Sequence, residues 1–254
     1  MKDMNVYKVM ELPEGHKAIG CHWVLEFKED NKGSSVYKAR LVTQGFSQVP
    51  EIDYGATFAP IIKPAIIQLL VMLGCQNNWE IDTFDVKRAF LWGVLKEKIY
   101  MCQPKGFEQG DWRKFVWLML HSIYRLKQLA LEWYKQVCSV MLDLGFVHTK
   151  SDHALFYYDS EDDIVAGITS CVTNALPMKV KCLIGWHVDD GMGISNSCSF
   201  LEKVKQRIVE KFDIKDLGPV TKYLVLRIMV FVLLNFYFIT MVLDSSYDLL
   251  SCDS

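Results

Sequence analysis

The feature that most constrains this chain is a pair of adjacent acids, Asp189 and Asp190, set between two apolar stretches in CLIGWHVDDGMGIS (residues 182–195). Each stretch has the length and composition of a buried strand, and Asp190-Gly191 is typical of tight turns, so the segment predicts a β-hairpin. A turn needs only one such acid, and two neighbouring like charges repel each other unless solvent or a cation compensates them. The pair is therefore consistent with a plain turn or with a metal ligand set.

A third acid bears on that choice. Asp85 stands about one hundred residues earlier, in FDVKRAF, after an alternating stretch that predicts a strand ending near it. If that strand lies beside the hairpin, three carboxylates meet at one edge of a sheet. Two-metal phosphoryl transfer requires such a cluster, because Mg²⁺ is held by one or two carboxylates together with substrate phosphates. Acids at strand ends are common, so the spacing alone leaves a structural interpretation open.

The rest of the chain predicts an α+β fold with antiparallel pairing, because helices and hairpins follow one another without a repeated strand–helix–strand alternation. In SFLEKVKQRIVEKF, Ser199 and Glu202 predict a capping box, and DLGP (216–219) predicts the end of that helix. The predicted elements, in order, are a hairpin over 18–42, a helix over 65–75, a strand ending near 85, a helix over 130–144, the hairpin over 182–195 and a helix over 199–212.

Composition narrows the class of protein. Of the 254 residues 51% are hydrophobic and 23% charged, which excludes a disordered chain. The net charge of −2 argues against a strongly basic nucleic-acid binder, although a local basic groove stays compatible with it. The eight cysteines form no C-x-x-C pair and no zinc-ligand spacing, which favours reduced thiols inside a cell.

An apolar stretch over 223–243 stands apart from the rest. It is about long enough to cross a bilayer, but Arg227 and Asn235 interrupt it and no basic cluster flanks it. It is open to two interpretations, a membrane anchor or a chain end that has diverged, and we expect the second.

Taken in order, several stretches resemble the reverse transcriptase domain of Ty1/copia-type LTR retrotransposons. The resemblance covers about residues 10–225 and leaves 226–254 as a divergent apolar tail. The stretches that carry it are LPEGHKAIGCHWVLEFK, YKARLVTQGFSQVPEIDYGATFAPIIK, NWEIDTFDVKRAFLWGVLKEKIYMCQPKGFE, LKQLALEWY, LGFVHTKSDHALFYY, WHVDDGMG and IKDLGPVTKYL.

The resemblance implies a right-hand polymerase palm and fingers, with an antiparallel palm sheet that carries the catalytic aspartates. It implies RNA-directed DNA synthesis from deoxynucleoside triphosphates on an RNA or DNA template-primer. Asp85, Asp189 and Asp190 match the metal-binding aspartates, which would hold two Mg²⁺ ions, or Mn²⁺ in their place. The implied setting is intracellular, in a cytoplasmic virus-like particle if the chain is expressed as part of an element, without stable membrane association.

Four further residues match substrate-binding positions by resemblance. Phe90 stands where related polymerases place an aromatic ring against the sugar, and an ordinary core phenylalanine is the alternative. Lys38 and Arg40 stand where cations would neutralise a triphosphate, and solvated charges on a strand edge are the alternative. Lys127, in LKQ, would touch the nucleotide or the template backbone.

The chain also departs from the family pattern near the expected site. His187 replaces a tyrosine, Arg125 a glycine and Ala130 a proline, and LMLHS replaces a segment that is usually basic. Two alternatives to an active polymerase follow: an inactive relic, which at most binds nucleic acid, or a membrane-attached fragment.

Overall fold

The computed structural model describes residues 4–29, 35–159, 179–220, 222–223, 226–233 and 236–243. The chain forms two compact units, each made of two separate segments. Unit 1 comprises Met1–Ala59 and Arg88–Cys138, and unit 2 comprises Pro60–Lys87 and Ser139–Ser254. The boundary between them falls inside helix α2 (Leu129–Asp143).

Unit 1 is built from antiparallel strands. A three-stranded sheet has the order β1-β6-β5, and β2 pairs with β3 in the predicted hairpin. Two single-turn helices, η1 and η2, accompany them. The bounds are β1 (Tyr7–Glu11), β2 (Cys21–Glu29), β3 (Ser35–Thr43), η1 (Gly45–Ser47), η2 (Ala89–Trp92), β5 (Val94–Cys102) and β6 (Phe115–His121).

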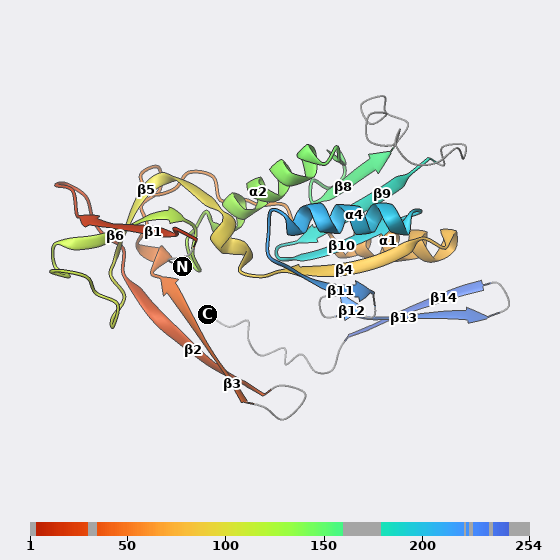
Figure 1. The fold of residues 1–254 in the computed structure, drawn as a ribbon, viewed down its shortest axis with the longest axis horizontal. Helices are drawn as coiled ribbons and strands as arrows, with labels where there is room; N and C mark the ends of the chain where they lie inside the picture. The colour runs from red at the N-terminus through yellow and green to blue at the C-terminus, as the bar shows by residue number, and fades with distance from the viewer. Residues whose placement is uncertain are drawn as a thin grey trace. The chain divides into compact units, whose positions relative to one another are not determined.

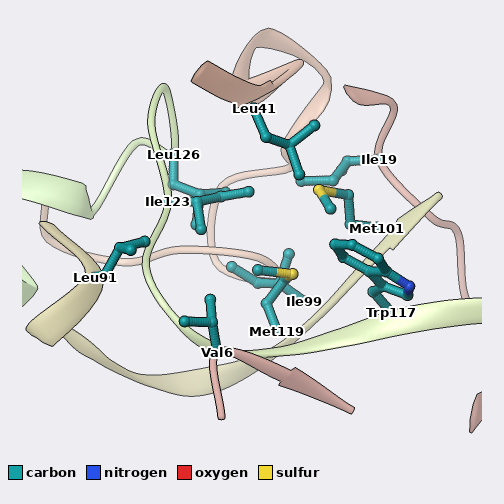
Figure 2. Packing of buried hydrophobic residues seen from close by; sticks show 10 residues of the cluster. All are labelled: Val6, Ile19, Leu41, Leu91, Ile99, Met101, Trp117, Met119, Ile123 and Leu126. Carbon is teal, nitrogen blue, oxygen red and sulfur yellow. The ribbon is translucent and has the colours of Figure 1, made fainter. Parts of the chain in front are cut away.

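The core of unit 1 lies on the three-stranded sheet. Figure 2 shows side chains from these strands pointing toward one another, with Ile123 and Leu126 closing the cluster. The apolar face of the hairpin extends beyond this core, because Leu25 and Tyr37 are exposed. The buried residues of the cluster are Val6, Ile19, Leu41, Leu91, Ile99, Met101, Trp117, Met119, Ile123 and Leu126.

Unit 2 contains one antiparallel six-stranded sheet with the order β11-β4-β10-β9-β8-β7. Helix α1 packs on one face and α4 on the other (Figure 1). The bounds are α1 (Pro64–Asn77), β4 (Glu80–Val86), β7 (Val147–His148), β8 (Leu155–Asp159), β9 (Lys181–His187), β10 (Asp190–Ser195), α4 (Cys198–Val209) and β11 (Ile214–Pro219).

Helix α1 begins at Pro64, one residue before the predicted start, because a proline at the first helical position has no N–H to leave unpaired. The helix buries Ile67 and Leu70 against Met192 and Ile194 of β10. It ends before Asn78, which takes the left-handed conformation that favours asparagine. Apolar burial therefore fixes α1 on the sheet face that carries Ile194.

Two predictions about the last helix were wrong. Its N-cap is Ser197, whose hydroxyl accepts a hydrogen bond from the backbone N–H of Phe200, so Ser199 lies inside the helix and forms no capping box. The helix already ends at Val209, and DLGP lies in β11 instead of terminating it. The DLGP segment pairs with β4 through a bulge between Asp216 and Gly218.

A buried lysine joins α4 to the sheet. The side chain of Lys205 is only 6% exposed, and its Nζ lies 2.7 Å from Asp82 of β4, 2.8 Å from Asp216 of β11 and 2.9 Å from Glu202. Burial acts to lower the pKa of Lys205, but hydrogen bonds to the three carboxylates outweigh it and the pKa is raised. Lys205 therefore stays charged and connects three elements of unit 2.

The apolar stretch over 223–243 forms strands. β12 (Lys222–Tyr223), β13 (Leu226–Leu233) and β14 (Phe236–Leu243) make a separate antiparallel sheet. No helix in the described part of the chain is long and apolar enough to cross a membrane. The α+β class and the antiparallel pairing are confirmed, whereas the division at residue 225 stays a prediction.

Replacing Lys205 by methionine should lower the free energy of unfolding by about 2–4 kcal/mol, because it leaves the half-buried carboxylate of Asp82 without its cation. Urea unfolding measures this loss. Lys203→Met is the matched control, since Lys203 is exposed on the same helix and its replacement should change stability by less than about 0.5 kcal/mol. Equal losses in the two variants would contradict a stabilising role for the cluster.

Removing all residues after Leu224 should leave the thermal midpoint nearly unchanged, because β13 and β14 pair with each other and with β12 rather than with the six-stranded sheet. Differential scanning calorimetry of the shortened and full chains checks this. A large drop would mean that these strands complete the core of unit 2.

Candidate active site

The pairing of β4 with β10 brings the predicted acids together. Asp85 lies directly opposite Asp190 in the antiparallel register. Directly opposed residues share a face of a sheet, so the two carboxylates lie side by side. The prediction that the strand of Asp85 lies beside the 182–195 hairpin is confirmed.

The hairpin turn lies two positions earlier than Asp190-Gly191 predicts. His187 pairs with Asp190, which leaves Val188 and Asp189 as the two turn residues. Val188 has φ of +57°, a conformation that is strained for a β-branched side chain. Such strain persists only where the surrounding structure imposes it, and it is often found at functional sites. The turn therefore presents Asp189 at the tip and holds Asp190 in the strand.

Gly191 is needed for close packing and not for the turn. A Cβ at this position would lie 2.2 Å from Cε2 of Phe84, far inside van der Waals contact. The Phe84 ring in turn meets Trp186 edge to face, with centroids 5.2 Å apart. The two buried rings fix the backbone next to Asp190 on the face opposite its carboxylate.

The electrostatics of Asp190 show that the three acids act on one another. Burial, together with the smaller effects of the charges of Asp189 and Asp85, raises the pKa of Asp190 from its ordinary value of 3.8 to about 6. A carboxyl group whose charged form is disfavoured in this way gains from a cation nearby. All three side chains are half-buried.

The donor set suits a hard divalent cation, but no closed cage exists. In the described ranges, no group of three or more His, Cys, Asp or Glu side chains is already arranged to hold a metal ion. Mg²⁺ does not require such a cage, because it commonly takes one or two carboxylates and completes its shell with waters and substrate phosphates. The residues therefore fit Mg²⁺ that arrives with a phosphate substrate.

Two more side chains share the row of Asp85 and Asp190. His187 of β9 lies opposite Asp190, and Lys215 of β11 lies opposite Asp85. Four adjacent strands therefore carry, in order, Lys215, Asp85, Asp190 and His187 on one face of the sheet. His187, the replacement for tyrosine, is thus a direct neighbour of an acid.

In unit 1, two of the predicted substrate-binding residues, Arg40 and Phe90, both contact the ring of Tyr124. The guanidinium carbon of Arg40 lies 5.8 Å from the centre of the Tyr124 ring, and the Phe90 ring meets the same ring edge to face at 5.4 Å. Arg40 also forms an ion pair of 2.5 Å with Glu26 on the polar face of the hairpin. Tyr124, which the sequence analysis did not single out, therefore connects Arg40 to Phe90.

The other two predicted residues are exposed. Lys38 lies opposite Glu26 on the hairpin, with its side chain in solvent. The Lys127 side chain is also exposed, while its backbone N–H donates to Oε1 of Gln48 at 2.9 Å. The neighbouring Gln128 is buried, and its amide and that of Gln48 hydrogen-bond each other at 3.1 Å. In LKQ the glutamine is structural and the lysine faces solvent.

Two lysines of unit 2 were missed by the sequence analysis. Lys205 had a signal, because it follows Leu201 and Val204 and precedes Ile208 at the spacing of a buried helix face. Lys215 had none, since its place opposite Asp85 depends on register across the sheet.

Comparison with known proteins identifies the family of the chain. A family model described as "Reverse transcriptase (RNA-dependent DNA polymerase)" matches residues 4–245, including β13 and β14. The chain is 34% identical over 224 residues to the retrovirus-related Pol polyprotein from transposon TNT 1-94 of Nicotiana tabacum, covering 87% of this chain and 16% of that protein.

Two further relatives come from plants and yeast. The Pol polyprotein from transposon RE1 of Arabidopsis thaliana is 32% identical, covering 80% of this chain and 13% of the relative. The transposon Ty1-NL2 Gag-Pol polyprotein of Saccharomyces cerevisiae is 26% identical, covering 45% and 6%. The chain thus spans less than a fifth of the length of each of these three relatives. It belongs to the reverse transcriptase family, as the reverse transcriptase domain of a Ty1/copia-type retrotransposon Pol polyprotein.

Proposed function

We propose that unit 2 is the palm of this polymerase domain and unit 1 its fingers, and that Asp85, Asp189 and Asp190 are its catalytic residues. The reaction is attack of a primer 3′-OH on the α-phosphate of a deoxynucleoside triphosphate, with pyrophosphate as the leaving group. The observation that carries the proposal is the register of β4 and β10, which places Asp85 opposite Asp190 and next to the turn of Asp189.

The three acids would hold two Mg²⁺ ions, or Mn²⁺. When bound, such a pair of ions stabilises charge on both the attacking and the leaving oxygen. Asp85 and Asp189 would be the principal ligands of the ions, and Asp190 would support them. The raised pKa of Asp190 supports this assignment, because it reports like charges gathered in a half-buried place.

The proposed roles in unit 1 concern the nucleotide and the template. Lys38 and Arg40 neutralise the triphosphate, for which Arg40 must exchange Glu26 for phosphate. Phe90 stands against the sugar and excludes a ribose 2′-OH, with its ring held by Tyr124. Lys127 binds the nucleotide or the template backbone from its exposed position.

The partners are an RNA or DNA template-primer and deoxynucleoside triphosphates. Within the polyprotein of an element, the domain would act inside cytoplasmic virus-like particles. A non-catalytic relic that binds nucleic acid is the second candidate, and Arg125 is the observation that favours it.

Arg125 has φ of +70°, a backbone conformation that costs an arginine about 1–2 kcal/mol and a glycine little. The position is also crowded, since a Cβ on Gly45 would clash with the carbonyl oxygen of Arg125. The backbone cannot relax without moving Gly45. The positive φ explains why the family usually has glycine at this position. Arg125 also adds an exposed cation there.

Removing the charge of Asp190 should stabilise the metal-free protein at pH 7. Because the folded-state pKa of about 6 exceeds the ordinary 3.8, stability falls as the pH rises from about 4 to 6 and stays reduced above that. Asp190→Asn should therefore raise the thermal midpoint at pH 7, with a difference that vanishes near pH 4. Thermal unfolding across this pH range measures the effect.

Mg²⁺ should reverse the order of the two thermal midpoints, so that the unmodified chain becomes more stable than Asp190→Asn. Millimolar Mg²⁺ should raise the midpoint of the unmodified chain but not that of Asp190→Asn, because an amide does not supply the charge that holds the ion. Asp143→Asn, at an exposed site at the end of α2, is the control and should respond as the unmodified chain does. Equal Mg²⁺ responses in all three proteins would contradict the assigned metal site.

Arg125→Gly should raise the free energy of unfolding by about 1 kcal/mol, whereas Arg125→Ala keeps the strain and should not. We expect little or no primer extension by the unmodified chain on an RNA template with Mg²⁺, because Arg125 crowds the nucleotide. Extension should recover in part in Arg125→Gly, and the recovery should vanish when Asp189→Asn is added.

These variants separate the two candidates. Robust extension by the unmodified chain would contradict the relic. Recovery that survived Asp189→Asn would contradict the assigned mechanism. Recovery in Arg125→Ala as well as in Arg125→Gly would assign the inhibition to the side chain rather than to backbone strain.

A further inference from the structure

Glu26 lies beside both cations that the proposed function assigns to the triphosphate. It is directly opposite Lys38 in the register of β2 with β3, and the next pair on the same face of the hairpin is Val24 with Arg40. Opposed and diagonal residues of two paired strands share a face, so Lys38 and Arg40 are both neighbours of Glu26 on β3. An acid therefore stands in the place where two cations would meet phosphates.

Glu26 holds the guanidinium of Arg40. Its Oε1 lies 2.5 Å from Nη1 of Arg40, and the hydrogen bond to Glu26 is the largest cause that raises the pKa of Arg40 above its ordinary value. Carboxylates and phosphates both present two oxygens that match the N–H groups of a guanidinium. Glu26 therefore occupies the position on Arg40 that an oxygen of a phosphate would take.

The ion pair is accessible to water, and a phosphate can replace the carboxylate. The side chains of Arg40 and Glu26 are 31% and 38% exposed. Pairs exposed to this degree are screened by solvent and add little to stability, so the fold does not depend on keeping them. Arg40 has a second contact, because its guanidinium carbon lies 5.8 Å from the centre of the Tyr124 ring. Tyr124 can therefore orient the cation after Glu26 has left it.

We propose that Glu26 is an internal competitor for phosphate at the nucleotide site, which occupies Arg40 until a triphosphate displaces it. The inference rests on the proposed function, which assigns Arg40 to the triphosphate. A triphosphate carries more charge than one carboxylate and can contact Lys38 at the same time, so it displaces Glu26 from Arg40. The exchange lowers the affinity for the nucleotide, and base pairing with the template then contributes a larger share of the binding.

The test measures nucleotide binding without turnover. The probe is fluorescein-labelled dUTP, bound in Mg²⁺ to the full chain with a dideoxy-terminated DNA primer on an RNA template, and displaced by dTTP. Glu26→Gln keeps the size of the side chain and removes its charge, so the affinity for dTTP should rise about 3- to 5-fold, near the upper limit for an exposed pair. Glu11→Gln, at an exposed site on β1, is the matched control and should leave the affinity unchanged.

A second variant shows whether the gain passes through Arg40. Arg40→Met should weaken dTTP binding, and adding Glu26→Gln to it should restore nothing, because no guanidinium is left to release. The same gain with and without Arg40 would overturn the inference, since Glu26 would then act only as a nearby negative charge. A purely structural ion pair predicts the opposite sign, a loss of affinity in Glu26→Gln through a less ordered Arg40, and that result would also overturn the inference.

The failures of the two proposals are distinguishable. If Arg40→Met weakens dTTP binding while Glu26→Gln leaves it unchanged, the inference about Glu26 is overturned and the proposed function stands. If Arg40→Met does not change dTTP binding, or if the unmodified chain does not bind the labelled nucleotide in Mg²⁺, both are overturned.

Discussion

Unit 2 depends on apolar packing that is strong enough to hold three like charges close together. The pairing of β4 with β10 sets Asp85 against Asp190, with Asp189 in the adjoining turn, and each charge acts against the others. Apolar burial opposes this repulsion from both sides of the sheet: Ile67 and Leu70 of α1 pack on one face, and the rings of Phe84 and Trp186 pack on the other. The site is stable because its scaffold is buried, although its acids destabilise it locally.

Strand β4 carries two acids with opposite electrostatic surroundings. Asp82 faces α4 and is compensated within the protein by the buried ammonium of Lys205. Asp85 faces the other side, where the neighbouring Asp190 keeps a raised pKa. The structural acid Asp82 and the proposed catalytic acid Asp85 therefore lie on opposite faces of the same strand. Two residues separate them along β4, and an odd number of residues between them would have placed both on the same face.

Much of this arrangement could be predicted from local patterns. The Asp-Asp hairpin, the strand before Asp85 and the helix after Pro64 were each signalled by apolar runs or by a proline. Features that depend on tertiary register were not. DLGP was expected to stop a helix, yet pairing with β4 makes it a bulged strand. The turn moved to Val188 because the Phe84 ring occupies the space above Gly191 and holds that glycine in the strand.

In the candidate site, too, local sequence predicted some features, and others depend on tertiary contacts. The three aspartates were identified from sequence, and the structure supplies their common face. Tyr124 joins Arg40 to Phe90 across a sequence separation that no local pattern spans. Lys205 could have been found, because it interrupts the apolar stripe of α4, and a lysine at such a position needs carboxylate partners.

The division of each unit into two chain segments affects the order in which the chain can fold. β4 lies between its partners β10 and β11 in the sheet, but both follow it by more than about one hundred residues in the chain. During synthesis β4 must therefore wait, with both edges unpaired, until about one hundred further residues have emerged. Unit 1 can complete its sheet earlier, once β6 and its neighbours are made. The proposed catalytic strand is thus among the last to be secured, and a ribosome that stops before β10 releases a chain with an open, aggregation-prone strand edge.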